Sequence, residues 1–114
     1  MRKKLLFALA PALLFAATAA EARPARCVVT SEGNPTWRGA CNFVAERGGS
    51  FSITPLRGAF LEGIEDVSVS IVSPGVAEVR GLTSDGINSR WGEARRSRRD
   101  PACWIGEDFS ICVY

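Results

Sequence analysis

Four cysteines, at positions 27, 41, 103 and 112, limit how this 114-residue chain can fold. An even number of cysteines in a short exported chain indicates a disulfide framework, here with three possible connectivities. No C-x-x-C pair and no histidine accompanies them, so a metal site would need cysteines alone at irregular spacing. We therefore predict two disulfide bonds, formed by Cys27, Cys41, Cys103 and Cys112, and no metal or other cofactor.

The first 22 residues have the pattern of a secretory signal peptide. Three basic residues at positions 2–4 precede an apolar run from Leu5 to Ala17, and small residues continue to an A-x-A site at residues 20–22. The apolar run is shorter than the roughly 20 residues that cross a bilayer. We expect cleavage after Ala22, a single mature domain at 23–114 that does not span a membrane, and a periplasmic or secreted location.

The expected mature domain contains neither lysine nor histidine. This composition excludes histidine-based catalytic triads, Schiff-base chemistry and histidine-ligated zinc. Its eleven arginines balance eleven acidic residues, so its net charge is zero. Because counterion release rewards broad positive charge, this balance disfavours nucleic acid as a partner. The composition therefore favours a protein without enzymatic activity.

Short alternating runs bounded by Gly, Pro, Asn and Asp dominate the mature region, which indicates an antiparallel all-β fold. The clearest run is Val67–Ile71, which has one apolar face and one polar face. We predict a small β-barrel or sandwich of about eight short strands and two disulfides, with Pro55–Asp66 as a helical turn or a loop. The predicted strands are Arg26–Ser31, Trp37–Glu46, Ser50–Thr54, Val67–Val72, Val76–Thr83, Ile87–Arg95, Ala102–Gly106 and Phe109–Val113.

The turn signals favour a local pairing of the cysteines. Cys27 and Cys41 are equidistant from Asn34, so a hairpin centred there would place them opposite one another. Cys103 and Cys112 are equidistant from the pair at 107–108, and ladder parity then makes them a non-hydrogen-bonded pair with Cα atoms about 4.5 Å apart. That distance suits a disulfide. We predict bonds 27–41 and 103–112, with long-range bridges between the two hairpins as the alternative.

An arginine-rich segment at Arg90–Pro101 is the most unusual local feature, because it holds five of the eleven mature arginines. Guanidinium groups bind phosphate, carboxylate or sulfate through paired hydrogen bonds. The plainer interpretation is a solvated loop that keeps a sheet edge soluble. As a binding surface for an anionic protein or envelope component, the segment would use Arg90, Trp91, Arg95, Arg96, Arg98 and Arg99.

Two environments are expected for Trp91. A two-residue turn at Asp85-Gly86 would place Trp91 opposite Arg80, in cation–π contact. The same register would place Glu78 opposite Glu93, which is unfavourable for two like charges. A shift of one residue would instead leave Trp91 as part of the core.

The cysteine framework resembles that of small exported proteins from proteobacteria. It comprises Cys27, Gly39–Phe43, Gly49–Ile53, Ala102–Ile105 and Ile111-Cys112. This resemblance implies export and two disulfides but supplies no activity. A second resemblance, through size, strand content and the segment Trp91–Ala94, is to periplasmic inhibitors of c-type lysozyme, which are small disulfide-bonded β-barrels. Those inhibitors carry a lysine at their inhibitory site, and the mature region has none.

Three functions are compatible with these observations. The leading hypothesis is an exported, non-catalytic binding module or inhibitor that uses its arginine-rich loop to contact an anionic partner. The second is an envelope structural or stress protein, in which the arginines only keep an edge soluble. The third is a small hydrolase of cell-wall sugars, which needs two converging carboxylates; Glu65 and Asp85 are the candidates.

Overall fold

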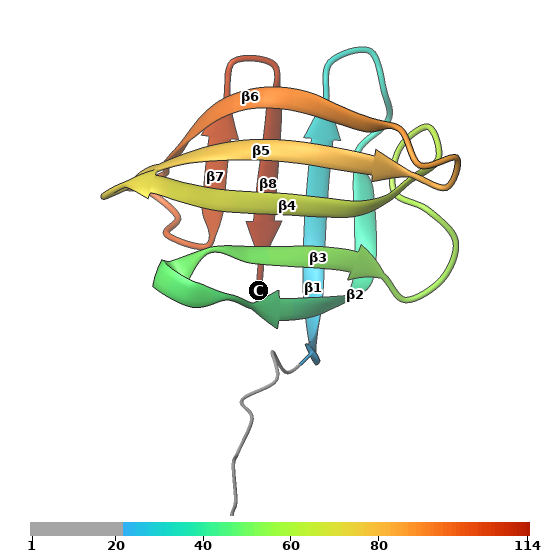
Figure 1. Ribbon diagram of the computed structural model, residues 1–114, viewed down its shortest axis with the longest axis horizontal. Helices are drawn as coiled ribbons and strands as arrows, with labels where there is room; N and C mark the ends of the chain where they lie inside the picture. Colours follow the sequence, from blue (N-terminus) through green and yellow to red (C-terminus); the bar gives the residue numbers. More distant parts are fainter. Residues whose placement is uncertain (1–21) are drawn as a thin grey trace, which may run out of the picture.

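A computed structural model describes residues 22–114, which form a closed antiparallel barrel (Figure 1). Each strand pairs with the next one along the chain, and β1 closes the barrel on β8. The strands are β1 (Ala22–Ser31), β2 (Trp37–Ala45), β3 (Phe51–Pro55), β4 (Ile64–Ser73), β5 (Val76–Thr83), β6 (Asn88–Arg96), β7 (Cys103–Gly106) and β8 (Phe109–Val113). The expected all-β barrel of about eight strands is therefore confirmed. Apart from Ala22, the expected signal peptide lies outside the described residues.

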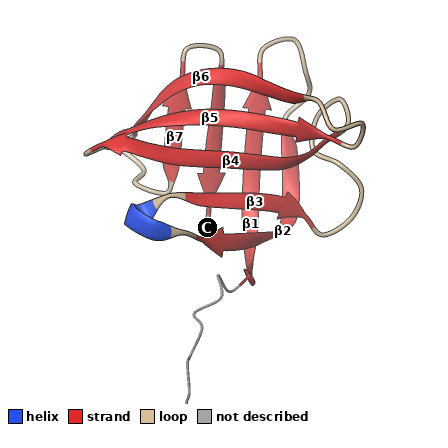
Figure 2. Ribbon diagram, in the orientation of Figure 1, coloured by secondary structure: helices blue, strands red, loops and turns tan. Residues whose placement is uncertain are grey.

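Helical structure in residues 22–114 is limited to one 3-10 turn, η1 (Arg47–Gly49), between β2 and β3 (Figure 2). No helix in this range is long and apolar enough to cross a membrane. Two predicted strands have the observed bounds, those of β5 and β8, whereas β4 begins three residues before its predicted start. Between β3 and β4, residues 56–63 form a loop and not a helical turn.

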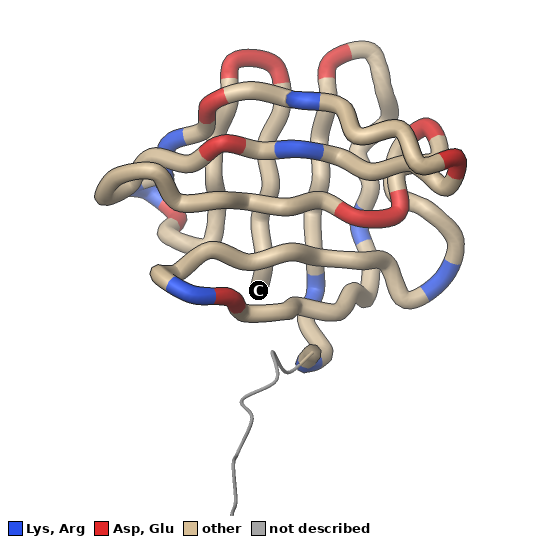
Figure 3. Tube along the Cα trace, viewed as in Figure 1, with Lys and Arg blue, Asp and Glu red and all other residues tan. Residues whose placement is uncertain are grey.

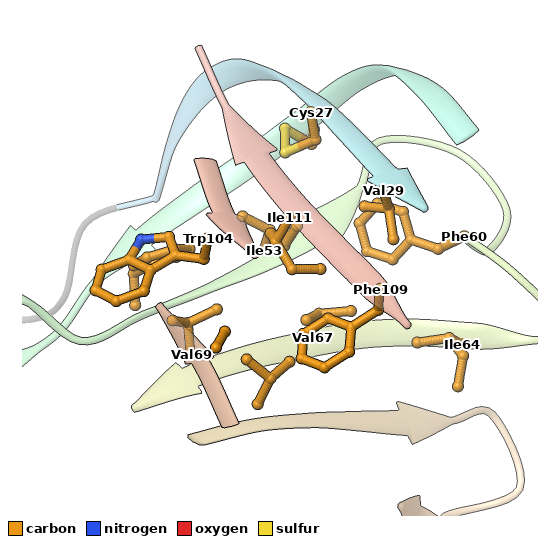
Figure 4. Close-up of a cluster of buried hydrophobic side chains, with 14 of the residues drawn as sticks. Cys27, Val29, Ile53, Phe60, Ile64, Val67, Val69, Trp104, Phe109 and Ile111 are labelled. Atoms are coloured by element: carbon orange, nitrogen blue, oxygen red, sulfur yellow. A yellow bond between two sulfur atoms is a disulfide. The ribbon is translucent and has the colours of Figure 1, made fainter. Parts of the chain in front are cut away.

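The core is a cluster of apolar side chains enclosed by the strands (Figure 4). Strand alternation directs every second side chain inward. The fully buried members include Val29, Ile53, Val67, Val69, Val79 and Ile111, each 0% exposed. The β3–β4 loop adds Phe60 and Leu61, each 7% exposed. The Phe60 ring meets Trp37 edge-on at 4.7 Å, so this loop extends the apolar core.

Both predicted disulfides are present, with Cα–Cα distances of 5.9 Å for Cys27–Cys41 and 4.0 Å for Cys103–Cys112. Cys103 and Cys112 lie directly opposite one another, as predicted. Cys27 instead faces Gly39, so the first disulfide crosses the β1–β2 ladder diagonally. The predicted register of this hairpin is wrong by two residues, because the hairpin is centred on Gly33 and not on Asn34; the φ of 87° at Gly33 suits the left-handed position of a turn.

Barrel topology divides the connections between two ends. In an up-and-down antiparallel barrel, successive connections alternate from one end to the other. The β1–β2, β3–β4, β5–β6 and β7–β8 connections therefore share one end. The other end contains the β2–β3, β4–β5 and β6–β7 connections, the first residues of β1 and the last residues of β8.

Candidate binding site

Acidic residues and arginines are divided unequally between these two ends (Figure 3). The residues of an end are those of its connections together with the two nearest residues of each strand. The acidic end has six acids and two arginines: Glu32, Arg38, Arg57, Glu62, Glu65, Asp85, Glu107 and Asp108. The arginine end has six arginines and two acids: Arg23, Glu46, Arg47, Arg95, Arg96, Arg98, Arg99 and Asp100. A domain with balanced charge is thus polarised from end to end.

Two of the predicted site arginines form ion pairs with acids of the same barrel. Arg90 donates from its Nε to Glu78 across the β5–β6 ladder, and Arg95 Nη2 lies 2.9 Å from Glu93 Oε2. The hydrogen bond from Arg90 is the main reason that the pKa of Glu78 is lowered and that of Arg90 raised. Glu78 does stand opposite Glu93, as predicted, and each carboxylate is compensated by its own arginine. These two guanidinium groups are therefore already occupied.

The predicted contact between Trp91 and Arg80 is not formed. The β5–β6 register shifts by one residue at Val79/Arg80, so Arg80 faces Arg90 and Trp91 is the additional residue of a β-bulge. Gly92 follows it with a φ of 120°, a conformation that residues with a Cβ rarely adopt. The bulge therefore separates the two expected registers: the one built on a two-residue turn holds at Val79↔Gly92 and beyond, and the one shifted by a residue holds from Arg80 to the turn.

The Trp91 ring packs against the core, where it lies edge-on to the Phe109 ring at 5.6 Å. It also lies over Gly81, where an added Cβ would stand 2.9 Å from the indole nitrogen. Trp91 borders open pockets beside β6, but its principal contacts are with its own barrel. The structure therefore gives Trp91 a packing role and does not place it with the arginines of the β6–β7 loop.

The other predicted arginines, Arg96, Arg98 and Arg99, lie at the arginine end. None of them forms an ion pair within residues 22–114. The nearby acid, Asp100, is engaged elsewhere, since its carboxylate accepts hydrogen bonds from the Ala102 N–H at 3.1 Å and the Tyr114 hydroxyl at 2.5 Å. The loop therefore presents guanidinium groups without a compensating carboxylate.

Side-chain hydrogen bonds define the shape of this loop. The Ser97 hydroxyl accepts from the backbone N–H groups of Arg99 and Asp100 at 3.2 Å and 3.1 Å, a turn typical of serine. Backbone bonds from Ser97 N–H to Cys103 O and from Cys103 N–H to Asp100 O, both 2.9 Å, close the loop onto β7. The arginines thus project from an ordered backbone.

A pocket of about 200 Å³ lies at the arginine end, with walls from both the start of β1 and the β6–β7 loop. Its apolar walls include three aromatic rings, those of Phe43, Phe51 and Trp104. Phe51 and Trp104 are 6% and 5% exposed, and the Phe43 and Phe51 rings lie 5.1 Å apart. The pocket is therefore continuous with the barrel core.

Two arginines of the pocket wall stack on these rings. Arg23 Cζ lies 4.5 Å from the centroid of Phe43, its cross-strand partner on β2. Arg96 Cζ lies 5.6 Å from the ring of Trp104, its partner on β7, and Arg96 Nε donates to Pro101 O at 2.7 Å. Stacking occupies the face of a guanidinium and leaves N–H groups at its edge for an anion.

Three residues of this pocket, Arg23, Phe43 and Trp104, were not among the site residues predicted from the sequence. A hairpin centred on Asn34 would have paired Arg23 with Ala45, so the register error concealed its contact with Phe43. Only Arg96 was identified, through the arginine run. A first hairpin centred on Gly33 would have paired Arg23 with Phe43, so the correct register was the signal for this contact.

The two hydrolase candidates are both exposed residues of the acidic end. Glu65 is the second residue of β4, and Asp85 lies in the β5–β6 turn. Within the described part of the chain, no group of three or more His, Cys, Asp or Glu side chains is arranged to hold a metal ion.

Comparison with family models, curated proteins and solved structures finds no match to this chain. The candidate site therefore rests on the contacts and charges described above.

Proposed function

We propose that this protein is an exported, non-catalytic binding module whose arginine end contacts an anionic partner. The observation that carries the proposal is the placement of six arginines against two acids at one end of a domain with balanced charge. Arg98 and Arg99 project from the β6–β7 loop there, and Arg23 and Arg96 line the adjoining pocket. None of these four forms an ion pair within residues 22–114.

Export is supported by the disulfides together with the pattern of the first 22 residues. Structural disulfides persist in oxidising compartments such as the periplasm and the extracellular space. We expect the protein recovered outside the cytoplasm to begin at Arg23, which intact-mass measurement tests directly. A product that keeps the first 22 residues would contradict this part of the proposal.

Several features favour recognition over general attraction to polyanions. The balanced charge of the mature region gives no broad positive field. Guanidinium groups carried on a hydrogen-bonded loop instead match individual carboxylate or phosphate groups through paired hydrogen bonds. An inhibitor is the case of this proposal in which the anionic partner is an enzyme.

A solely structural role gives no reason for this arrangement of arginines. Charged residues protect sheet edges from pairing with other chains. The β6–β7 loop is instead a connection within a closed barrel, so it borders no terminal strand of an open sheet. Protection of a sheet edge therefore does not account for the charge at this loop, whereas contact with an anionic partner does.

Affinity capture from envelope extract and host secretions, with the processed, oxidised protein as bait, tests the proposal. Arg98→Ala/Arg99→Ala removes two unpaired arginines of the arginine end, and Arg38→Ala/Arg57→Ala is the matched control that removes the two exposed arginines of the acidic end. We expect a partner that the parent and the control retain, that the first variant loses, and that elutes as the salt concentration rises. Equal retention by both variants, or no partner for any of them, would overturn the proposal once circular dichroism has shown that the variants are folded.

A further inference from the structure

We propose that the pocket between Arg23 and Arg96 binds a carboxylate carried on an apolar side chain or chain terminus of a protein partner. This inference rests on the proposed function and names the chemical group that the arginine end recognises. It places an anchor site for the partner at the meeting point of β1, β2 and β7, and not on the outer wall of β6.

The charge of the pocket comes from two distant parts of the sequence. Arg23 lies on β1 and Arg96 at the close of β6, and both contribute to the wall of the same pocket. Neither forms an ion pair within residues 22–114. Each guanidinium lies over a ring at a cation–π distance, and this contact favours its place on the pocket wall before a ligand binds, so less conformational entropy is lost on binding.

The apolar part of the ligand is indicated by the rest of the wall. Phe43, Phe51, Trp104 and Val113 supply aromatic and aliphatic surface beside the two guanidinium groups. A bare phosphate or sulfate would bind the arginines and leave this surface in contact with water. A carboxylate next to an aromatic or aliphatic group would cover it and gain hydrophobic free energy.

Size indicates the source of the ligand. The pocket volume of about 200 Å³ is below the roughly 300–1,000 Å³ of sites for drug-sized molecules. It suits one ring-sized group, as in the anchor pockets of protein interfaces, which receive a single side chain. Long acyl chains exceed this volume, so a protein partner fits better than a glycolipid.

The test uses 3-phenylpropionate as a minimal probe, with 3-phenylpropanamide as its neutral analogue and inorganic phosphate as the bare anion. The chain has three tryptophans, and of these only Trp104 lines the pocket, so the three indole N–H signals in an NMR spectrum give internal controls. We expect 3-phenylpropionate to shift the Trp104 signal saturably, with little change at Trp37 and Trp91. The amide and phosphate should each bind at least about tenfold more weakly than 3-phenylpropionate.

Single substitutions then test the two guanidinium groups separately. Arg23→Gln and Arg96→Gln should each weaken the binding of 3-phenylpropionate by about tenfold, since each removes a charge-assisted hydrogen bond. Arg57→Gln, at the acidic end, is the matched control and should leave the affinity unchanged. The Arg23 variant leaves the β6–β7 loop intact, so it remains informative if Arg96→Gln disturbs that loop.

The assignment fails if 3-phenylpropionate leaves the Trp104 signal unmoved, if the amide binds as well as the acid, or if phosphate binds as tightly as 3-phenylpropionate. It also fails if Arg23→Gln binds like the parent. A partner lost by Arg98→Ala/Arg99→Ala together with an empty pocket would leave the proposed function standing and overturn this assignment alone. Specific binding of the probe without any captured partner would support the pocket and contradict the wider proposal.

Discussion

The Phe109 ring lies over Gly106, so that a Cβ added at Gly106 would stand 2.1 Å from Phe109 Cε1. The two residues flank the turn between β7 and β8, and Phe109 is 5% exposed in the core. Gly106→Ala must therefore displace a buried ring. We expect the free energy of unfolding to fall by about 1–3 kcal/mol, as overpacking of a core typically costs. Urea denaturation followed by tryptophan fluorescence measures this change.

Gly39→Ala is the control for that substitution. An added Cβ at Gly39 would meet only the outer atoms of the Trp37 ring, at 3.2 Å and 3.3 Å. Trp37 is partly exposed and its ring can move, so the loss of stability should be smaller. A larger loss for Gly39→Ala than for Gly106→Ala would contradict the packing described at the β7–β8 turn.

Each disulfide should contribute to stability by restricting the unfolded chain. The bonded cysteines are 14 and 9 residues apart, loop lengths for which the chain-entropy model gives about 3 kcal/mol. We expect Cys27→Ala/Cys41→Ala and Cys103→Ala/Cys112→Ala each to lower the free energy of unfolding by that order in urea. Peptide mapping without reduction should recover only the pairs 27–41 and 103–112, and any mixed pair would contradict the structure.

Asp66 should make the protein less stable as the pH rises above about 4. Burial raises the pKa of Asp66, and the charges of Glu46 and Glu65 add to this effect. The folded state therefore holds the proton more tightly than the unfolded state, so stability declines between the unfolded pKa, about 3.9, and the higher folded pKa. Asp66→Asn removes the penalty and should raise the urea midpoint at pH 7, with the advantage vanishing below about pH 4.

Glu65→Gln provides the comparison for Asp66→Asn. Its carboxylate is exposed, and its removal relieves only one of the two charges acting on Asp66. It should therefore raise the midpoint at pH 7 less than Asp66→Asn does. An Asp66→Asn variant whose advantage persists at pH 3 would show that the effect does not come from titration of this carboxyl.

Tyr114 should ionise at higher pH in the folded protein than in the unfolded chain. The hydrogen bond that its hydroxyl donates to Asp100 raises the pKa of Tyr114, with further contributions from burial and the carboxylate charge. This interaction is lost as the pH rises from the unfolded value, about 10, through the folded pKa. Because Tyr114 is the only tyrosine, absorbance near 295 nm reports it alone. Asp100→Ala should return the transition toward pH 10.

Much of the fold could be predicted from local patterns. Alternation in runs such as Val67–Ile71 and turn residues between them indicated strands that the structure confirms, including the bounds of β5 and β8. The 103–112 disulfide followed from ladder parity around a two-residue turn, and the structure pairs these cysteines directly. Such features depend on residues close together in the chain, so their geometry follows from strand period and turn type.

The candidate site was only partly predictable, because neighbours in sequence separate along a strand. With a rise of about 3.3 Å per residue, Arg90 and Arg96 lie roughly 20 Å apart along β6. Arg90 consequently pairs with Glu78 on the barrel wall, while Arg96 reaches Trp104 at the arginine end. The run of arginines in the sequence therefore does not form one surface.

The sequence by itself determined the all-β class, most strand positions and the direct pairing of Cys103 with Cys112, since these depend on alternation and turn chemistry within a few residues. Only the tertiary structure decided that Arg23 and Arg96 share a pocket and that Trp91 packs inward at a bulge. Those outcomes depend on strand register and on closure of the barrel. Strand register and barrel closure both depend on how the apolar faces of strands far apart in the sequence pack together in one core. A local sequence pattern does not specify that packing.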